Sequence, residues 1–151
     1  MAIERTLIII KPDGVQRNLV GEIIGRFERR GLKIAGMKLI QISKELAETH
    51  YEAHRGKGFF APTVAYMSSQ PTVVIALEGP NAIAISRQTI GATKPGEAAP
   101  GSIRADLGVD ISRNLVHGSA DAADAERELQ LYFKPDELIS YARAADVWLS
   151  E

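Results

Sequence analysis

The first thirty residues combine a short apolar run with a stretch of helical spacing. Residues 6–10 (TLIII) are apolar and mostly β-branched, which predicts a buried strand that ends at Lys11. Residues 12–14 (PDG) then predict a turn into a loop. Apolar residues next recur every three or four positions, which predicts a helix with Asn18 as its N-cap and Gly31 at its end. These apolar positions are Leu19 or Val20, Ile23, Ile24 and Phe27.

The middle of the chain continues with further strand and helix patterns. Residues 33–42 predict a second strand, and Ser43 is the expected N-cap of a helix over residues 44–55. Pro62 suits the first turn of a further short helix. The run TVVIAL (72–77) is the clearest strand pattern in the chain.

A long irregular stretch precedes the last strand and helix. The spacing predicts a helix over residues 81–90, closed by Gly91. The segment GATKPGEAAPG (91–101) lacks periodicity, and a loop of this length is usually functional or disordered. Residues 114–117 predict a last short strand, and residues 121–133 a helix. The order of elements predicts a mixed α/β fold.

Composition narrows the class of protein. The length of 151 residues fits a single domain, residues 1–151. With 18 basic and 19 acidic side chains, the net charge of −1 gives no general reason to bind nucleic acid or an anionic membrane. The sequence has no cysteine, which excludes disulfides and thiolate metal sites. The first residues resemble neither a signal peptide nor a membrane span, so a cytoplasmic protein is expected.

His117 ends a predicted strand and is followed by Gly118 and a helix. A glycine lets the backbone approach a ligand closely, and a helix N-terminus favours phosphate. An imidazole bonded to a neighbouring carbonyl is the alternative that this position leaves open. Glu128 can point from the last helix toward His117, where a carboxylate would orient the imidazole and stabilise its charge during nucleophilic attack. A solvated glutamate paired with Arg127 or Lys134 is equally compatible with the pattern.

Three cationic side chains stand in unusual positions for a chain with almost no net charge. Arg87 shares the apolar face of its helix with Ile83 and Ile90, so it either snorkels past the core or meets an anion. Lys11 follows a buried strand, where an unpaired ammonium is costly. Arg104 follows the loop rich in glycine and proline. Together the three cations indicate a local anion site.

Two other patterns carry less weight. GKGFFA (56–61) fits the dinucleotide fingerprint, but it follows a predicted helix instead of a strand. His50 and His54 are four residues apart, a spacing that zinc sites use, yet no third ligand is nearby in the sequence. The chain also lacks a P-loop, so nucleotide chemistry of that kind is excluded.

Three segments resemble those of the nucleoside diphosphate kinases and occur in the same order: KPDGVQR (11–17), TIGATKPGEAAPGSIRADLG (89–108) and RNLVHGS (113–119). The likeness extends over nearly the whole chain. It implies a ferredoxin-like βαββαβ sandwich, in which helices cover a four-stranded antiparallel sheet. It also implies ping-pong transfer of the γ-phosphate of a nucleoside triphosphate, typically ATP, to a nucleoside diphosphate through a phosphohistidine.

The resemblance assigns roles to the candidate catalytic residues. His117 matches the phosphorylated nucleophile, and Glu128 matches the carboxylate that supports it through a serine, here Ser119. Lys11 matches a lysine that contacts the transferred phosphate and the ribose. Tyr51 matches a tyrosine close to the catalytic histidine.

The resemblance also assigns the nucleotide-binding side chains. Asn114 matches the residue that reaches the ribose hydroxyl. Phe59 matches the aromatic on which the base stacks, with Ile111 on the other side of the base. The side chains that match the phosphate-binding ones are Arg87, Thr93 and Arg104.

The family implies Mg²⁺ held mainly by the nucleotide phosphates, with no metal ligands from protein side chains, and a homo-oligomer, a hexamer in preference to a tetramer. One departure is visible, because the family motif usually continues as HGSD. Here Ala120 follows Ser119, and Asp121 stands one place later, where it can still cap the helix.

Two other functions stay open. One is a regulatory module of ferredoxin-like fold that binds nucleotides without catalysis. The other, more distant, is a metal-dependent hydrolase that uses His50, His54 and His117.

Overall fold

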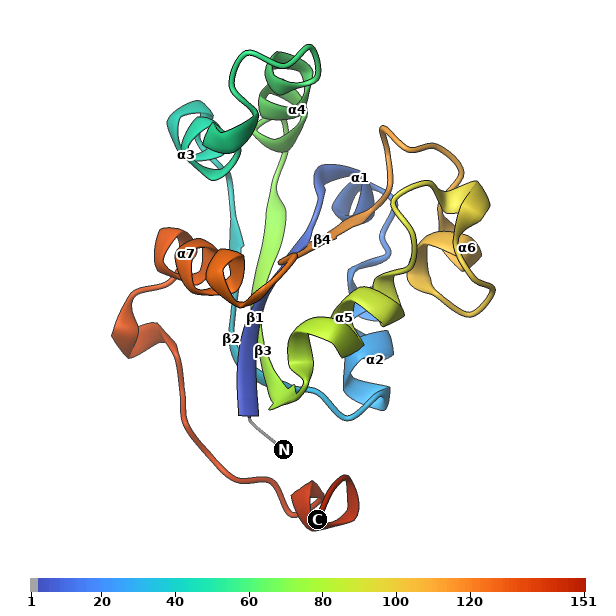
Figure 1. Cartoon of the computed structure of the whole chain (residues 1–151), viewed down its shortest axis with the longest axis vertical. Helices are drawn as coiled ribbons and strands as arrows, with labels where there is room; N and C mark the ends of the chain where they lie inside the picture. Colours follow the sequence, from blue (N-terminus) through green and yellow to red (C-terminus); the bar gives the residue numbers. More distant parts are fainter. Residues whose placement is uncertain (1–2) are drawn as a thin grey trace.

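The computed structural model describes residues 3–151, and its centre is a four-stranded antiparallel sheet with the strand order β2-β3-β1-β4 (Figure 1). The central strand β1 pairs with β3 over its whole length and with β4 near its carboxyl end. Strands β2 and β4 form the two edges. This arrangement confirms the expected ferredoxin-like fold. The strands are β1 (Ile3–Ile10), β2 (Lys33–Ile40), β3 (Thr72–Pro80) and β4 (Val116–Gly118).

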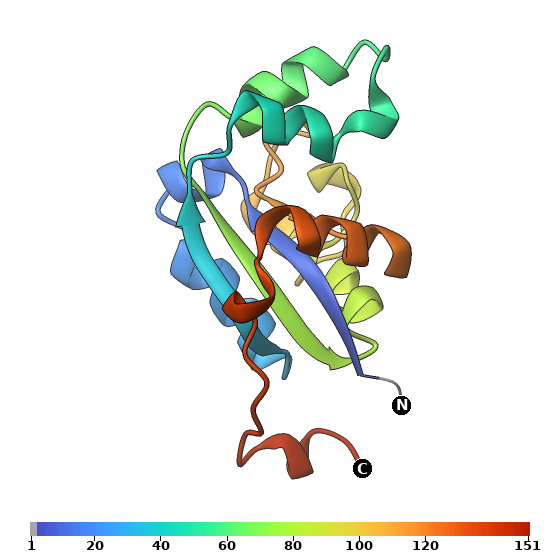
Figure 2. The ribbon, with the colours of Figure 1, turned by 90° about the vertical axis from the view of Figure 1, so that its left-hand side faces the viewer.

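Side chains of β1 alternate between two hydrophobic cores, one on each face of the sheet. Ile8 and Ile10 contribute to the core beneath α2 (Val20–Arg29) and α5 (Ala82–Ile90). Leu7 and Ile9 contribute to the opposite core, together with residues of α7 (Ala122–Tyr132). Figures 1 and 2 show these helices on opposite faces of the sheet. Because both faces of β1 are covered, its sequence is a continuous apolar run.

The remaining helices lie around the carboxyl end of β1. α3 (Lys44–His50) and α4 (Phe60–Met67) form a pair at one end of the molecule, between β2 and β3 in sequence (Figure 1). The short helices α1 (Pro12–Gln16) and α6 (Ile103–Leu107) lie on the side of α2 and α5. These four helices lie around the end of β1 that leads to Lys11.

Two predicted helix caps are confirmed. The Ser43 side chain accepts a hydrogen bond from the backbone N–H of Leu46 at 3.0 Å and begins α3. Asp121 accepts from the N–H of Asp124 at 2.8 Å and begins α7, so the shifted acid after Ala120 does cap the helix.

Several predicted boundaries are wrong. The segment expected to be a turn and loop after Lys11 is the helix α1, because a proline at the first helical position starts a helix readily. Asn18 is not a cap, since it adopts a left-handed φ of 59° before the N-cap residue Leu19. α3 ends at His50, before a 3₁₀ turn over Glu52–His54. The helix α6 was not predicted.

The last strand begins at Val116 instead of residue 114, because Leu115 has a φ of 75° and interrupts the extended backbone. Gly31 follows the end of α2 with a φ of 100°, as expected of a glycine that terminates a helix. The C-terminal segment runs from α7 past the β2 edge, where the Ile139 N–H donates to the Ala35 carbonyl at 2.8 Å (Figure 2). Among residues 3–151, every helix is too short or too polar to cross a bilayer.

Candidate active site

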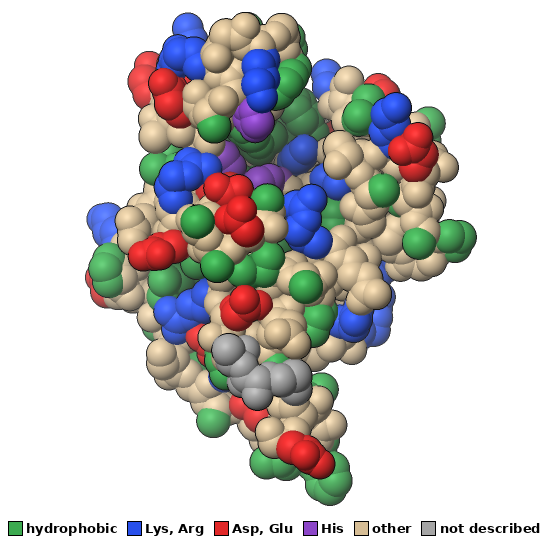
Figure 3. Space-filling view, in the orientation of Figure 1, with side chains coloured by type: hydrophobic (Ala, Val, Ile, Leu, Met, Phe, Trp, Pro, Cys, Tyr) green, Lys and Arg blue, Asp and Glu red, His purple; other side chains and the backbone are tan. Residues whose placement is uncertain are grey.

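A cavity of about 490 Å³ opens where α5, α7 and β4 face the α3–α4 pair. Figure 3 shows histidine side chains within this hollow and lysine and arginine side chains around it. The lining includes most of the residues that the sequence singled out: Lys11, Tyr51, Phe59, Arg87, Thr93, Arg104, Asn114, His117 and Glu128. Ser119 is fully buried behind the wall, and Ile111, which is 45% exposed, lies outside the lining.

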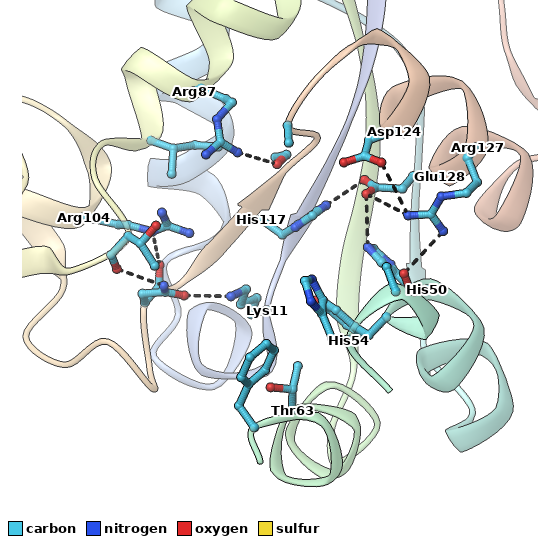
Figure 4. A pocket seen from close by; sticks show the side chains of 18 of the residues that line it. Lys11, His50, His54, Thr63, Arg87, Arg104, His117, Asp124, Arg127 and Glu128 are labelled. Carbon is cyan, nitrogen blue, oxygen red and sulfur yellow. Dashed lines mark hydrogen bonds and ion pairs between the residues drawn. The ribbon is translucent and has the colours of Figure 1, made fainter. Parts of the chain in front are cut away.

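His117 is held on β4 opposite Ile9 of the central strand. Its Nε2 lies 2.8 Å from Oε1 of Glu128, a residue of α7 that is 3% exposed (Figure 4). The Ser119 hydroxyl donates to the same carboxylate oxygen at 2.8 Å. The resemblance implied support through the serine, but the carboxylate contacts the imidazole directly. Within the described residues, Nδ1 of His117 makes no hydrogen bond.

The protonation states of this pair follow from burial. Burial lowers the pKa of His117 to about 4, although the hydrogen bond to Glu128 opposes the shift. Burial also opposes ionisation of Glu128, but the hydrogen bond from His117 and the neighbouring His50 hold the pKa of that carboxyl below its usual range. At pH 7 the imidazole is therefore neutral and faces a carboxylate. With the proton on Nε2, the Nδ1 atom keeps a lone pair that can act as a nucleophile.

Lys11, Asn114 and Thr93 form a chain of contacts along one wall. The Lys11 ammonium donates to Oδ1 of Asn114 at 2.7 Å, and Nδ2 of Asn114 donates to the Thr93 carbonyl at 3.1 Å. Burial, with a contribution from the charge of Arg104, lowers the pKa of Lys11 to about 8. Three residues from separate segments thus position one another beside the cavity.

Arg104 is 7% exposed, and backbone carbonyls hold its guanidinium group. Its Nε donates to the carbonyl of Asn114 at 3.1 Å, and its two terminal nitrogens donate to Gly91 and Val116. Burial lowers the pKa of Arg104 to about 10, so it remains charged at pH 7. A guanidinium has five N–H donors, so donors remain after these three bonds.

Arg87 approaches the cavity from α5, where its Nη1 donates to the Gly118 carbonyl at 3.1 Å (Figure 4). With Lys11 and Arg104 it places three cationic side chains around one cavity. This arrangement can bind a multiply charged anion such as a triphosphate. The anion site inferred from the sequence is thus assembled from three segments far apart in the chain.

Gly118, which was expected to permit close approach of a ligand, does line the cavity, and it also lies against Ile90. A Cβ atom at this position would lie 2.7 Å from Cδ1 of Ile90. The glycine therefore allows α5 to pack closely against β4, which brings Arg87 toward the site.

The turn before His117 depends on Asp13, a residue to which no role in the site was assigned from the sequence. Leu115 is a non-glycine residue with a left-handed φ of 75°, a conformation that costs on the order of 1–3 kcal/mol. Its N–H donates to Oδ2 of Asp13 at 3.1 Å, and its carbonyl accepts from the Lys11 N–H at 2.8 Å. The segment after β1 therefore fixes the backbone that leads to His117.

Aromatic side chains form the opposite wall. Phe59, which precedes α4, is 51% exposed and lies at the cavity, with its ring centroid 5.1 Å from that of His54. Tyr51 stacks on His50 with centroids 4.4 Å apart. Burial raises the pKa of Tyr51, so its phenol is neutral at pH 7. An exposed ring at a cavity mouth can stack on a nucleotide base.

The direct packing of His50 against His117 was not predicted from the sequence. It is 3% exposed, and its ring centroid lies 4.9 Å from that of His117 in an edge-to-face arrangement. From the sequence, His50 was grouped with His54 and, in the hydrolase alternative, also with His117. His54 is not part of the donor group that His50, His117 and Glu128 form. One signal in the sequence could have indicated that His50 is buried. His50 stands three residues after the apolar Ala47, so the two share one face of the helix. Asp124 and Arg127 of α7 also line the cavity.

Comparison with known proteins identifies this arrangement. The sequence model of a family described as "Nucleoside diphosphate kinase" matches residues 4–138. The chain belongs to the nucleoside diphosphate kinase family. Membership makes it an enzyme, a nucleotide-binding kinase of the kind that works with a divalent cation.

Relatives of similar length support this membership. The chain is 55% identical to a nucleoside diphosphate kinase of Desulfitobacterium hafniense over 148 residues, which cover 98% of this chain and 99% of the relative. It is 52% identical to a nucleoside diphosphate kinase of Archaeoglobus fulgidus over 148 residues, with coverage of 98% of each. A solved structure of a halophilic family member from Halobacterium salinarum, in complex with CDP, matches with a TM-score of 0.96 and 45% identity. That match covers 99% of this chain and 100% of the other.

Proposed function

We propose that this chain transfers the γ-phosphate of a nucleoside triphosphate, typically ATP, to a nucleoside diphosphate through a phosphohistidine at Nδ1 of His117. The observation that carries the proposal is the 2.8 Å contact between Nε2 of His117 and Oε1 of Glu128. It places the ring proton on Nε2 and leaves the lone pair of Nδ1 for the cavity. The CDP bound to the Halobacterium salinarum relative is consistent with a nucleotide in this cavity.

The transfer takes place in two matching steps. Nδ1 attacks the γ-phosphorus, the bond to the β–γ bridging oxygen breaks, and a nucleoside diphosphate leaves. Glu128 balances the positive charge that the ring gains, through the Nε2–H hydrogen bond, and Ser119 orients the carboxylate. A second diphosphate enters, its terminal oxygen attacks the phosphorus, and the P–N bond breaks to restore the neutral imidazole. One site serves both steps, which is ping-pong catalysis.

The cationic wall would bind and position the phosphates. Phosphoryl transfer requires mainly alignment and compensation of negative charge. Lys11 and Arg87 supply charge from opposite sides of the nucleophile, and Arg104 adds the donors that its backbone contacts leave. Thr93 contributes a hydroxyl to the phosphates, and Asn114 binds the ribose.

The base would bind at the aromatic wall. Phe59 provides a stacking surface, which tolerates purines and pyrimidines alike because every base has a π-face. Ile111 is proposed to border the other side of the base, although it lies beyond the present cavity lining. Tyr51 packs behind the imidazole pair through His50.

Mg²⁺ is the proposed divalent cation, held by the nucleotide phosphates. Mg²⁺ prefers oxygen ligands and commonly binds through substrate phosphates and water. Among the described residues that line the cavity, the carboxylates are Asp124 and Glu128, and Glu128 already bonds to His117 and Ser119. The donor set therefore fits a cation that arrives with the nucleotide and neutralises its charge.

The proposed assembly is a homo-oligomer, a hexamer in preference to a tetramer. The edge strand β2 exposes Met37 and Leu39, the latter by 66%, and the C-terminal segment exposes Trp148 by 87%. Exposed apolar side chains on a sheet edge commonly mark contacts with another chain. A cytoplasmic location is proposed from the composition, together with independence from membranes and nucleic acid.

Labelling with [γ-³²P]ATP tests the proposal. The protein should take up one acid-labile, alkali-stable phosphate, and His117→Ala should abolish the uptake. Labelling that persists in His117→Ala would refute the assignment. In a mixture with ATP, GDP and magnesium the protein should make GTP, whereas a nucleotide-binding regulatory module would make nothing and a metal-dependent hydrolase would release inorganic phosphate.

A further inference from the structure

Nε2 of His50 is a buried nitrogen without a hydrogen-bond partner in the described part of the chain. The other ring nitrogen, Nδ1, lies 2.7 Å from the hydroxyl of Tyr132. Nε2 lies 3.4 Å from Oε2 of Glu128, which is long for a hydrogen bond. A buried polar atom left unpaired is destabilising, so the position of this nitrogen beside His117 and Glu128 requires an explanation.

Glu128 lies between two imidazoles. Its Oε1 contacts Nε2 of His117 at 2.8 Å, and its Oε2 faces Nε2 of His50 at 3.4 Å (Figure 4). One donor atom from each of the three residues lies within 4.8 Å of the other two. Two imidazoles and one carboxylate form a ligand set that zinc enzymes use, with the fourth position open. All three residues line the cavity, so a cation from solvent can reach them.

The distances suit a small adjustment into a metal site. Zinc bonds of 2.0–2.2 Å in a tetrahedron place ligand atoms roughly 3.3 Å apart. With Oε2 of Glu128 as the ligand atom, its separation from Nε2 of His50 already has about this value. The 2.8 Å contact of His117 is to the other oxygen, Oε1, so Nε2 of His117 has to turn from Oε1 toward the cation. The widest separation in the group has to close by at most about 1.5 Å, and the His117 side chain, 18% exposed, has room to rotate.

Tyr132 completes the site from behind. When the hydroxyl oxygen accepts a hydrogen bond from Nδ1–H of His50, the lone pair of that ring is on Nε2 and points at Glu128. Metal-bound imidazoles are usually oriented by such a bond at the second nitrogen. We propose that His50, His117 and Glu128 form a binding site for a zinc-class divalent cation, and that the bound cation arrests phosphoryl transfer.

Phosphoryl transfer stops because the cation binds the imidazole of His117, and this part of the inference rests on the proposed function of His117. Coordination takes the lone pair of Nε2, so the single proton of the neutral imidazole moves from Nε2 to Nδ1. Nδ1 then has no lone pair with which to attack phosphorus, and the metal neutralises the charge of Glu128. No proton or electron leaves the site. Mg²⁺ is a poor occupant because it prefers oxygen ligands in an octahedron.

Binding is tested on the full-length protein without nucleotide. Co²⁺ is the probe, because low-coordinate cobalt has intense d–d absorption, and Zn²⁺ is then titrated to displace it. We expect one site per chain. Tyr132→Phe should weaken binding about 10–100-fold, as loss of a bond to a metal ligand does elsewhere, and His50→Gln should weaken it further. His54→Gln is the matched control, because His54 lines the same cavity but is outside the group, and it should leave affinity unchanged.

Arrest is tested by ³²P uptake from ATP at fixed excess Mg²⁺, with free Zn²⁺ set by a metal buffer. Uptake should fall as the site fills, recover on chelation, and require more Zn²⁺ in Tyr132→Phe by the factor found for binding. Full uptake at saturating Zn²⁺, or affinity that is lost in His54→Gln but kept in Tyr132→Phe and His50→Gln, would overturn the inference. Absence of uptake in protein free of Zn²⁺, with Mg²⁺ still present, would instead overturn the proposed function and leave the binding result valid.

Discussion

Nε2 of His117 and Oε1 of Glu128 are 2.8 Å apart, and this contact determines which imidazole nitrogen is available for chemistry. The carboxylate oxygen also accepts the Ser119 hydroxyl, so its orientation is fixed from the buried side. Because burial keeps the imidazole neutral, the pair carries its single negative charge on Glu128. In the proposed reaction the ring therefore starts with Nδ1 unprotonated, and Glu128 is placed to compensate the positive charge that the ring gains.

Glu128→Gln should slow phosphorylation of His117 because the amide can accept the Nε2–H bond but carries no charge. We expect kcat/KM to fall by roughly 2–4 kcal/mol of transition-state stabilisation, the order found when one preorganised electrostatic group is removed. Single-turnover ³²P uptake measures the effect. Glu126→Gln, an exposed change on the same helix, serves as the control. Equal rates for the two variants would show that the carboxylate charge has no role.

Arg104→Ala should also reduce kcat/KM by roughly 2–4 kcal/mol. The substitution removes a buried cation from the cationic wall and leaves three backbone carbonyls without their hydrogen-bond donor. Steady-state kinetics with ATP and a diphosphate acceptor, together with urea unfolding, would measure both consequences. An unchanged rate in a folded variant would place Arg104 outside the site.

The pH profile of kcat/KM should be bell-shaped. In the proposed reaction His117 attacks in its neutral form, and its pKa is lowered to about 4, so activity should fall only as pH drops toward that value. The proposed role of Lys11 requires its charged form, and its pKa is lowered to about 8, so activity should fall again as pH rises above about 8. Lys11→Arg keeps the charge and should move the alkaline limb to higher pH. An alkaline limb that stays in place would assign it to another group.

Gly118→Ala should destabilise the fold because the new Cβ would lie 2.7 Å from Cδ1 of Ile90. Overpacking of this kind costs roughly 1–3 kcal/mol in the free energy of unfolding. Ile90→Val removes the conflicting methyl group, so the double variant should regain part of the loss. Urea denaturation of the four proteins of the cycle measures the coupling. Additive effects would mean that the two positions do not conflict.

The elements that the sequence predicts well are those whose pattern is local. β1 and β3 are apolar runs because both their faces are covered, and α5 shows helical spacing closed by Gly91. α6 has only five residues, too few for a periodic pattern, and begins at the Ser102 cap. α1 was missed because its proline has two interpretations, turn or helix start, that only tertiary contacts distinguish.

The site is partly visible in the sequence for the same reason. His117, Arg87 and Lys11 are polar residues in apolar surroundings, and each can be noticed alone. The pairing of His50 with Tyr132 joins positions 82 residues apart, so no local pattern reveals it. The left-handed backbone at Leu115 is likewise invisible, because leucine is an uncommon residue for that conformation. The roles of Asn114 and Thr93 came only from family resemblance.

Arg104 contacts both the cavity and the backbone of the strand that carries His117. β4 is three residues long. The guanidinium of Arg104, which belongs to the cationic wall of the cavity, also donates a hydrogen bond to the carbonyl of Val116, the residue before His117. In the proposed function a phosphate bound by Arg104 would therefore act on the same side chain that holds the strand of His117. A substitution at position 104 would alter nucleotide binding and the placement of the imidazole together.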